Sequence, residues 1–338
     1  HIHETMIKSA LPALFLTLAL TACGSRKGAD ASDAAADSAE AAANAITAVA
    51  NADSAMSYVA RQVAFGPRTP GSEAHRECRS WLAGKLTSLG VENVAVSEEA
   101  VTTADGVGRT AYNIFGSINP GATRRVLLLA HYDTRPHADE DPDPANRSTP
   151  LDGANDGASG VAVLLDVARA LRANPVDSIG VDILLTDLED SGTDGDDTSW
   201  CLGTQKWVEN MPYTDGNLPA YGILLDMVGG RDARFNREMI SDSYARAICD
   251  KVWAVAAASG LSARFPNERG GAVIDDHLYI NRAGIPCIDI IENANPATGS
   301  FNPTWHTLGD NIGAIDPATL AAVSQVVLNT LAREAGKF

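Results

Sequence analysis

The chain has 338 residues, with 43 acidic and 26 basic side chains and a formal net charge of −17. This length is enough for one large core or for two ordinary domains. The acidic excess argues against nucleic acid or an anionic membrane surface as a partner, because like charges repel at long range.

Residues 1–23 are predicted to be a leader that is not part of the fold. Residues 1–5 look like a cloning or gene-annotation remnant. A basic residue and the apolar stretch 10–20 follow the order of a secretion signal, and the sequence LTAC that ends at Cys23 resembles the lipidation site of bacterial lipoproteins. We therefore expect a periplasmic protein that is attached to a membrane only through lipid. The outer membrane is favoured, because the residues after the cysteine lack the aspartate that retains many bacterial lipoproteins at the inner membrane. An ordinary secretion signal with a chance cysteine is the alternative.

Residues 24–55 are predicted to be a flexible tether. They are rich in Ala, Asp and Ser and have almost no large apolar side chains, so they cannot bury enough surface to offset the entropy of ordering. No linker interrupts residues 56–338, which are expected to form a single domain. Its cysteines are Cys78, Cys201, Cys249 and Cys287. None has the spacing of a zinc ribbon or a redox motif, so their pairing stays open.

Hydrophobic periodicity predicts the elements in chain order. Helices are expected over 54–63 and 72–89, and a hairpin around the turn at Asp105-Gly106. A continuous apolar run predicts a buried strand over 125–131. Further elements are expected in alternation: helix 160–173, strand 179–186, helix 203–210, strand 221–226, helix 242–258, strand 285–291 and helix 317–334. This order predicts an α/β fold, a three-layer sandwich with a mixed, mostly parallel central sheet.

Polar residues gather where the predicted strands end. They are His131, Asp133, Asp187, Glu189, Asp190, Asp226 and Glu292. In a parallel sheet the ligand site lies beyond the carboxyl ends of the strands, so these side chains are candidates for one site. The glycine-rich stretch 151–160 places Asp156 between a strand and a helix, where it either binds a ligand or merely caps the helix.

Two acidic positions have a physical reason to be functional. Glu189 and Asp190 are adjacent, so their side chains leave the backbone in different directions and can serve different functions, although an exposed acidic loop is the alternative. Asp226 closes a buried strand, which is a costly place for a charge unless it is paired or bound to metal.

Six short motifs in this order resemble the M28 zinc-peptidase superfamily. They are HYD at 131–133, GANDGASG at 153–160, ED at 189–190, LDMVG at 225–229, DDH at 275–277 and WHT at 305–307. The loop 135–144 and the sequence SWCLG at 199–203 are more similar to glutaminyl cyclases, in the bacterial type that resembles the animal enzyme. The resemblance covers about residues 60–335 and implies a zinc exopeptidase fold, also called aminopeptidase-like.

The resemblance implies a metal centre and a proton-transfer group. One zinc ion per chain would be bound by three residues at matching positions: Asp156, Asp190 and His306. A fourth position is left for water or substrate, as in catalytic zinc sites. Glu189 matches the general acid/base, and Asp226 and Asp275 match acids in its hydrogen-bond network. Asp190 stands where many relatives have glutamate, which shortens the ligand arm.

The implied reaction converts the N-terminal glutamine of peptides or proteins into pyroglutamate and releases ammonia. Trp200 and Trp305 are candidate walls of the substrate pocket, although a tryptophan near a loop packs into the core at least as often. A monomer is expected. One alternative is a di-zinc aminopeptidase, in which His131 and Asp226 bind a second zinc. The other is a lipoprotein binding domain without catalysis, because a fold does not dictate function.

Overall fold

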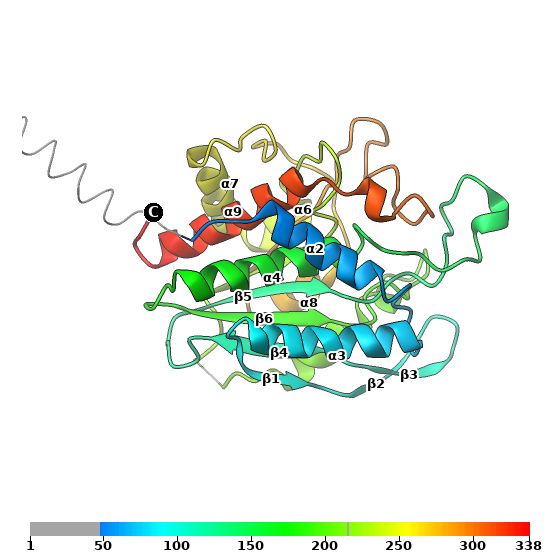
Figure 1. The fold of residues 1–338 in the computed structure, drawn as a ribbon, viewed down its shortest axis with the longest axis horizontal. Helices are drawn as coiled ribbons and strands as arrows, with labels where there is room; N and C mark the ends of the chain where they lie inside the picture. The colour runs from blue at the N-terminus through cyan, green and yellow to red at the C-terminus, as the bar shows by residue number, and fades with distance from the viewer. Residues whose placement is uncertain (1–47, 215) are drawn as a thin grey trace, which may run out of the picture. The chain divides into compact units, whose positions relative to one another are not determined.

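A six-stranded sheet forms the centre of the fold in the computed structural model, which describes residues 48–214 and 216–338 (Figure 1). In spatial order the strands are β1 (Glu92–Val96), β4 (Ile114–Ile118), β6 (Gly180–Thr186), β5 (Arg125–His131), β7 (Tyr221–Leu225) and β8 (Cys287–Ile290). Strands β6, β5, β7 and β8 are parallel to one another, whereas β4 is antiparallel to β6 and β1 to β4. The predicted mixed, mostly parallel sheet is confirmed.

Helices cover both faces of this sheet and complete the three layers (Figure 1). The larger apolar cluster includes residues of α2 (Ala52–Val63), α3 (Glu73–Ser88), α4 (Ala158–Ala173), α7 (Arg246–Ala258) and α9 (Pro317–Glu334). The smaller cluster includes residues of α5 (Leu202–Trp207) and α8 (Asp276–Arg282). The short helix α6 (Met239–Tyr244) contacts β8 and α8.

Strand β5 shows why the sequence there is continuously apolar. All seven of its residues are buried. Val126 and Leu128 belong to the larger apolar cluster, whereas Leu127 and Leu129 belong to the smaller one on the opposite face. A strand buried on both faces needs apolar side chains at successive positions rather than at alternate ones.

Two predicted elements differ in detail from the structure. The hairpin at Asp105-Gly106 exists as β2 (Glu99–Thr102) and β3 (Gly108–Ala111), but these strands form a separate two-stranded sheet. The predicted helix 242–258 is broken at Ala245, whose φ of −136° is not helical. The break lets α6 contact β8 while α7 contacts α9.

The predicted end of the tether at residue 55 is wrong, because the described chain is already packed from residue 48. Ala48 and Ala55 are fully buried. The backbone N–H of Asn51 donates to Asp166 (3.0 Å), and that of Ala50 donates to Gln325 (3.0 Å). Hydrogen bonds to polar side chains of α4 and α9 therefore order this segment without large apolar side chains. The leader and the tether up to residue 47 lie outside the described residues.

The cysteines of the described chain are all buried and free: Cys78, Cys201, Cys249 and Cys287. Residues 48–338 belong to one compact unit, apart from residue 215, which is not described. None of the helices in this part of the chain has both the length and the apolar character needed to cross a bilayer.

Candidate active site

A cavity of about 200 Å³ lies at the carboxyl edge of the parallel strands, where the sequence predicted a ligand site. The predicted site residues that line it are Asp156, Glu189, Asp190, Trp200, Asp226, Asp275, Trp305 and His306. The ends of β5, β6 and β7 bring the first acids together, and the loop between β8 and α9 adds the imidazole. These eight residues are spread over the sequence from Asp156 to His306, so only the fold makes them neighbours.

Three of the lining residues form a group that fits a zinc ion. Asp156, Asp190 and His306 each offer one atom within 4.8 Å of the other two. Nε2 of His306 lies 3.2 Å from Oδ1 of Asp190 and 3.6 Å from Oδ2 of Asp156. Oδ2 of Asp190 is buried and has no hydrogen-bond donor among the described residues, a costly state that a bound cation would relieve. Carboxylate oxygens and imidazole nitrogens are both zinc ligands, and three protein ligands are typical of a catalytic zinc site.

Two glycines allow the loop with Asp156 to reach this position. A Cβ on Gly157 would lie 2.3 Å from the carbonyl oxygen of His131, and one on Gly160 would lie 2.1 Å from that of Leu225. Only glycine lets α4 begin so close to the ends of β5 and β7. No side chain caps the N-terminus of α4, so helix capping does not explain Asp156.

Two buried carboxylates hold the ligand loops: Asp133, which the sequence placed among the candidates at the strand ends, and Asp310, which no sequence pattern singled out. Asp310 accepts hydrogen bonds from the backbone N–H of Asp156 (3.1 Å) and of the residue before it (2.7 Å). Asp133 accepts from the backbone N–H of Glu189 (3.2 Å) and of Asp190 (3.1 Å). Burial and the charge of Asp156 raise the pKa of Asp310 to about 7. No local pattern predicts that these two carboxylates accept backbone hydrogen bonds, because their partners are distant in the sequence.

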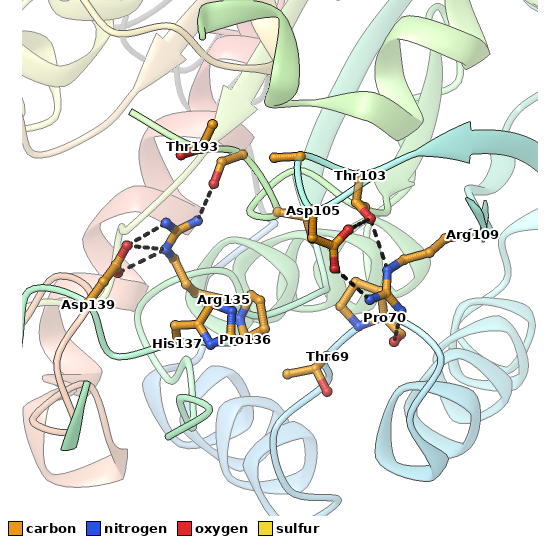
Figure 2. Close-up of a pocket in the computed structure, with 13 residues that line it drawn as sticks. Thr69, Pro70, Thr103, Asp105, Arg109, Arg135, Pro136, His137, Asp139 and Thr193 are labelled. Atoms are coloured by element: carbon orange, nitrogen blue, oxygen red, sulfur yellow. Dashed lines mark hydrogen bonds and ion pairs between the residues drawn. The ribbon is translucent and has the colours of Figure 1, made fainter. Parts of the chain in front are cut away.

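An arginine supports the ligands from a neighbouring polar cavity of about 480 Å³ (Figure 2). Arg135 donates to the backbone carbonyl of Asp190 (3.2 Å) and to the carboxylate of Asp139, and its guanidinium lies 4.8 Å from the ring centre of Trp200. Asp139 in turn lies 3.4 Å from Nδ1 of His306. A carboxylate on the outer nitrogen of a metal-binding histidine fixes the ring orientation.

Charge decides the protonation of His306. Burial by itself lowers the pKa of this imidazole, but the charge of Asp190 and the contact with Asp139 outweigh it and raise the pKa to about 10. Zinc binds neutral imidazole, so metal binding here must release a proton.

His131 lies at the end of β5 and joins a second group of candidate ligands. Its Nε2 is 2.9 Å from Oδ1 of Asp156 and 3.3 Å from Oδ1 of Asp226. These three residues also offer atoms within 4.8 Å of one another. Asp156 belongs to both groups, so its carboxylate is placed to bridge two metal positions.

Glu189 has the environment of a proton-transfer group. It is 7 % exposed, which rules out the exposed acidic loop. Burial raises the pKa of Glu189 well above the usual glutamate value, and the nearby charges of Asp275 and Asp190 raise it further, against the opposing effect of His131. A carboxyl group with a raised pKa can both take and return a proton near neutral pH.

Two tryptophans form walls of the cavity. The ring centres of Trp200 and Trp305 lie 6.3 Å and 3.9 Å from that of His306, with interplanar angles of 21° and 22°. Phe301 packs on Trp305 with ring centres 4.9 Å apart. Both tryptophans are partly exposed where they line the cavity, so neither is simply a core residue.

Two polar residues at strand ends do not join the site. Asp187 accepts from the backbone N–H of Tyr112 (2.8 Å) and contacts His75 (2.8 Å). Glu292 accepts from Asn295 (2.7 Å) and Asn302 (3.0 Å). Neither acid lines the cavity, so both serve the surrounding structure.

Comparison with known proteins supplies the family. Residues 113–331 match the model of peptidase family M28. The glutaminyl-peptide cyclotransferase-like protein of Mus musculus is 25% identical over 291 residues, which cover 80% of this chain and 72% of the relative. The structure of Bacteroides thetaiotaomicron glutaminyl cyclase bound to N-acetylhistamine is 46% identical, with a TM-score of 0.80 and coverage of 84% of this chain and 98% of that one. Porphyromonas gingivalis glutaminyl cyclase is 44% identical, with a TM-score of 0.82 and coverage of 85% and 100%.

Proposed function

Because the chain belongs to peptidase family M28, we propose that it is a zinc-dependent glutaminyl cyclase that converts the N-terminal glutamine of peptides or proteins into pyroglutamate with release of ammonia. One observation carries the proposal. Glu189 and Asp190 are consecutive residues in one cavity, yet Asp190 groups with Asp156 and His306, while Glu189 lies in a separate cluster with Cys201 and Asp275. A proton-transfer carboxylate therefore adjoins a metal ligand.

The metal centre proposed for this reaction is a single zinc ion per chain. Asp156, Asp190 and His306 would hold it. Bound there, zinc supplies a Lewis acid that polarises the γ-carbonyl group of the substrate glutamine. The nucleophile is the α-amine of the same glutamine, so the attacking group is already held close to the carbon that it attacks.

The residues of this chain supply the proton transfer and the enclosure. Glu189 takes a proton from the substrate ammonium and returns it to the departing amide nitrogen. Asp226 and Asp275 lie beside it, and their charges favour its protonated form. The cavity of about 200 Å³ has room for one side chain, and Trp200 and Trp305 limit the access of water to it.

A di-zinc aminopeptidase is the second candidate, and one observation favours it. His131, Asp156 and Asp226 form a complete second ligand group that shares Asp156 with the first. In that enzyme Glu189 would activate water for attack on the first peptide bond.

The product of a glutamine-initiated peptide separates these two functions. With the zinc-loaded protein, the peptide is expected to lose one molecule of ammonia, and its α-amine becomes the amide of the pyroglutamate ring. Every peptide bond should survive, because the attacked carbonyl belongs to the side chain. Mass spectrometry of the product measures this directly. The same peptide with an acetylated N-terminus is the control and should stay unchanged, since its nucleophile is blocked. Release of free glutamine would instead establish the aminopeptidase.

We further propose that the mature protein is a monomeric lipoprotein of the bacterial periplasm, anchored through Cys23 at the outer membrane. The lipidation motif supports the anchor, and residues 24–47 are available as a spacer before the packed chain. Two or more acyl chains suffice for stable attachment where one is marginal.

Replacement of Cys23 tests the anchor. Cys23→Ser is expected to move the protein from the membrane fraction to the soluble periplasmic fraction with unchanged specific activity, because the catalytic residues lie far along the chain. Fractionation followed by immunoblotting measures this. Ser25→Ala keeps the cysteine and should stay with the membranes; a membrane-bound Cys23→Ser protein would refute lipidation at this residue.

A further inference from the structure

The thiol of Cys201 contacts the carboxylate of Glu189. Its Sγ lies 3.5 Å from Oε1, within the range of an S–H···O hydrogen bond. Elsewhere in the described chain no other hydrogen bond to this carboxylate is formed, and Nε2 of His131 lies 4.0 Å from Oε2, beyond hydrogen-bond distance. The proton-transfer group therefore has one donor, and that donor is a thiol.

The backbone fixes this contact. Three successive N–H groups, those of residues 201–203, donate to the carbonyl oxygens of residues 189, 188 and 187 at 2.9, 2.9 and 3.1 Å. This pairing places Cys201 directly opposite Glu189. Cys201 also has a φ of 57°, and it is fully buried just before α5. The thiol position is thus determined by the main chain rather than by a mobile side chain.

The Cys201 thiol is protonated, as a hydrogen-bond donor must be. Burial raises the pKa of Cys201 well above the usual cysteine value, and the charges of Asp276 and Glu189 raise it further. The group therefore stays a neutral S–H. A thiol is a weaker donor than a hydroxyl group, so it can orient a carboxylate without strongly reducing its affinity for a proton.

We propose that Cys201 is a positioning residue, whose thiol donates a hydrogen bond to Oε1 of Glu189 and holds that carboxylate in its orientation for proton transfer. This rests on the proposed function, because the cyclase mechanism gives Glu189 the task of moving the substrate protons. Cys201 touches no substrate atom and acts through Glu189 alone.

Substitution of Cys201 tests the role by separating kcat from KM. Cys201→Ala is expected to lower kcat roughly 2- to 10-fold, the value of one hydrogen bond, with KM and zinc content unchanged. Cys201→Ser keeps a donor and is expected to recover most of the lost kcat. Neither alanine nor serine is branched at Cβ, so the two variants place the same steric demand on the backbone and differ in the hydrogen-bond donor.

Cys249→Ala is the matched control. Its thiol is also fully buried, in α7, but unlike that of Cys201 it forms no hydrogen bond with Glu189. Any cost of losing a buried thiol should appear there as a lower melting temperature, without a change in kcat. A Cys201→Ala enzyme with wild-type kcat, or one that loses zinc in proportion to activity, would overturn the proposal.

Infrared spectroscopy of the S–H stretch tests the contact without relying on activity. The band of Cys201 is identified as the one that disappears in Cys201→Ser. It is expected to move to higher frequency in Glu189→Ala, because the acceptor is gone, while the band that disappears in Cys249→Ala stays fixed. A Cys201 band that does not respond to Glu189→Ala overturns the proposal whatever the enzyme does. If the band moves but the wild type makes no pyroglutamate, the contact stands and the proposed function fails, together with the positioning role.

Discussion

Glu189→Gln is expected to lower kcat for cyclisation by roughly 10²- to 10⁴-fold, the usual contribution of a positioned acid/base group. The amide has almost the shape of the carboxylate but cannot take the substrate proton. Zinc content should stay unchanged, because Asp190 rather than Glu189 belongs to the ligand group. Steady-state kinetics on a glutamine-initiated peptide, with metal analysis of the same samples, measures both quantities.

An exposed glutamate provides the control for this substitution. Glu98 lies on the surface and does not line the cavity, so Glu98→Gln should leave kcat and zinc content unchanged. Full activity in Glu189→Gln would show that another group moves the protons. Loss of zinc in that variant would instead place Glu189 among the ligands.

Removal of one metal ligand is expected to abolish both zinc binding and activity. His306→Ala and Asp156→Ala each leave two protein ligands, which is too few to hold zinc through exhaustive dialysis. The wild type should retain one zinc ion per chain and each variant none. Elemental analysis of dialysed protein measures this, and circular dichroism checks that the variants are folded.

Replacement of a histidine outside the ligand group is the control for the loss of zinc in His306→Ala. His137 is exposed in the neighbouring polar cavity, so His137→Ala should keep one zinc ion and full activity. Two zinc ions in the wild type and one in His131→Ala would contradict the single-zinc proposal. That result would favour the aminopeptidase, because His131 belongs only to the second ligand group.

The order of the elements and the position of the site could be predicted from the sequence. The apolar run at 125–131 predicts a strand because β5 is buried on both faces, and burial on both faces requires an apolar side chain at almost every position of the strand. The acids at 189, 190 and 226 were found because parallel strands end at one edge, so residues that follow different strands become neighbours. Both arguments use local pattern together with a general rule of sheet architecture.

Other features depend on contacts that local pattern does not encode. The fold begins before residue 55 because Asn51 bonds to Asp166, and the helix expected over 242–258 breaks so that its two halves can meet different neighbours.

The same limit applies inside the site. The strand-end position of Asp133 could be predicted, but not its role as a hydrogen-bond acceptor, and in the sequence Asp139 and Asp310 resemble any other aspartate and Cys201 any other cysteine. Their roles come from contacts with particular groups elsewhere in the chain, such as the bond from the backbone N–H of Asp156 to Asp310. Hydrophobic periodicity reports which face of an element is buried, because that preference acts at every turn of a helix and every residue of a strand. A single polar contact acts at one position only, so the tertiary structure alone decides it.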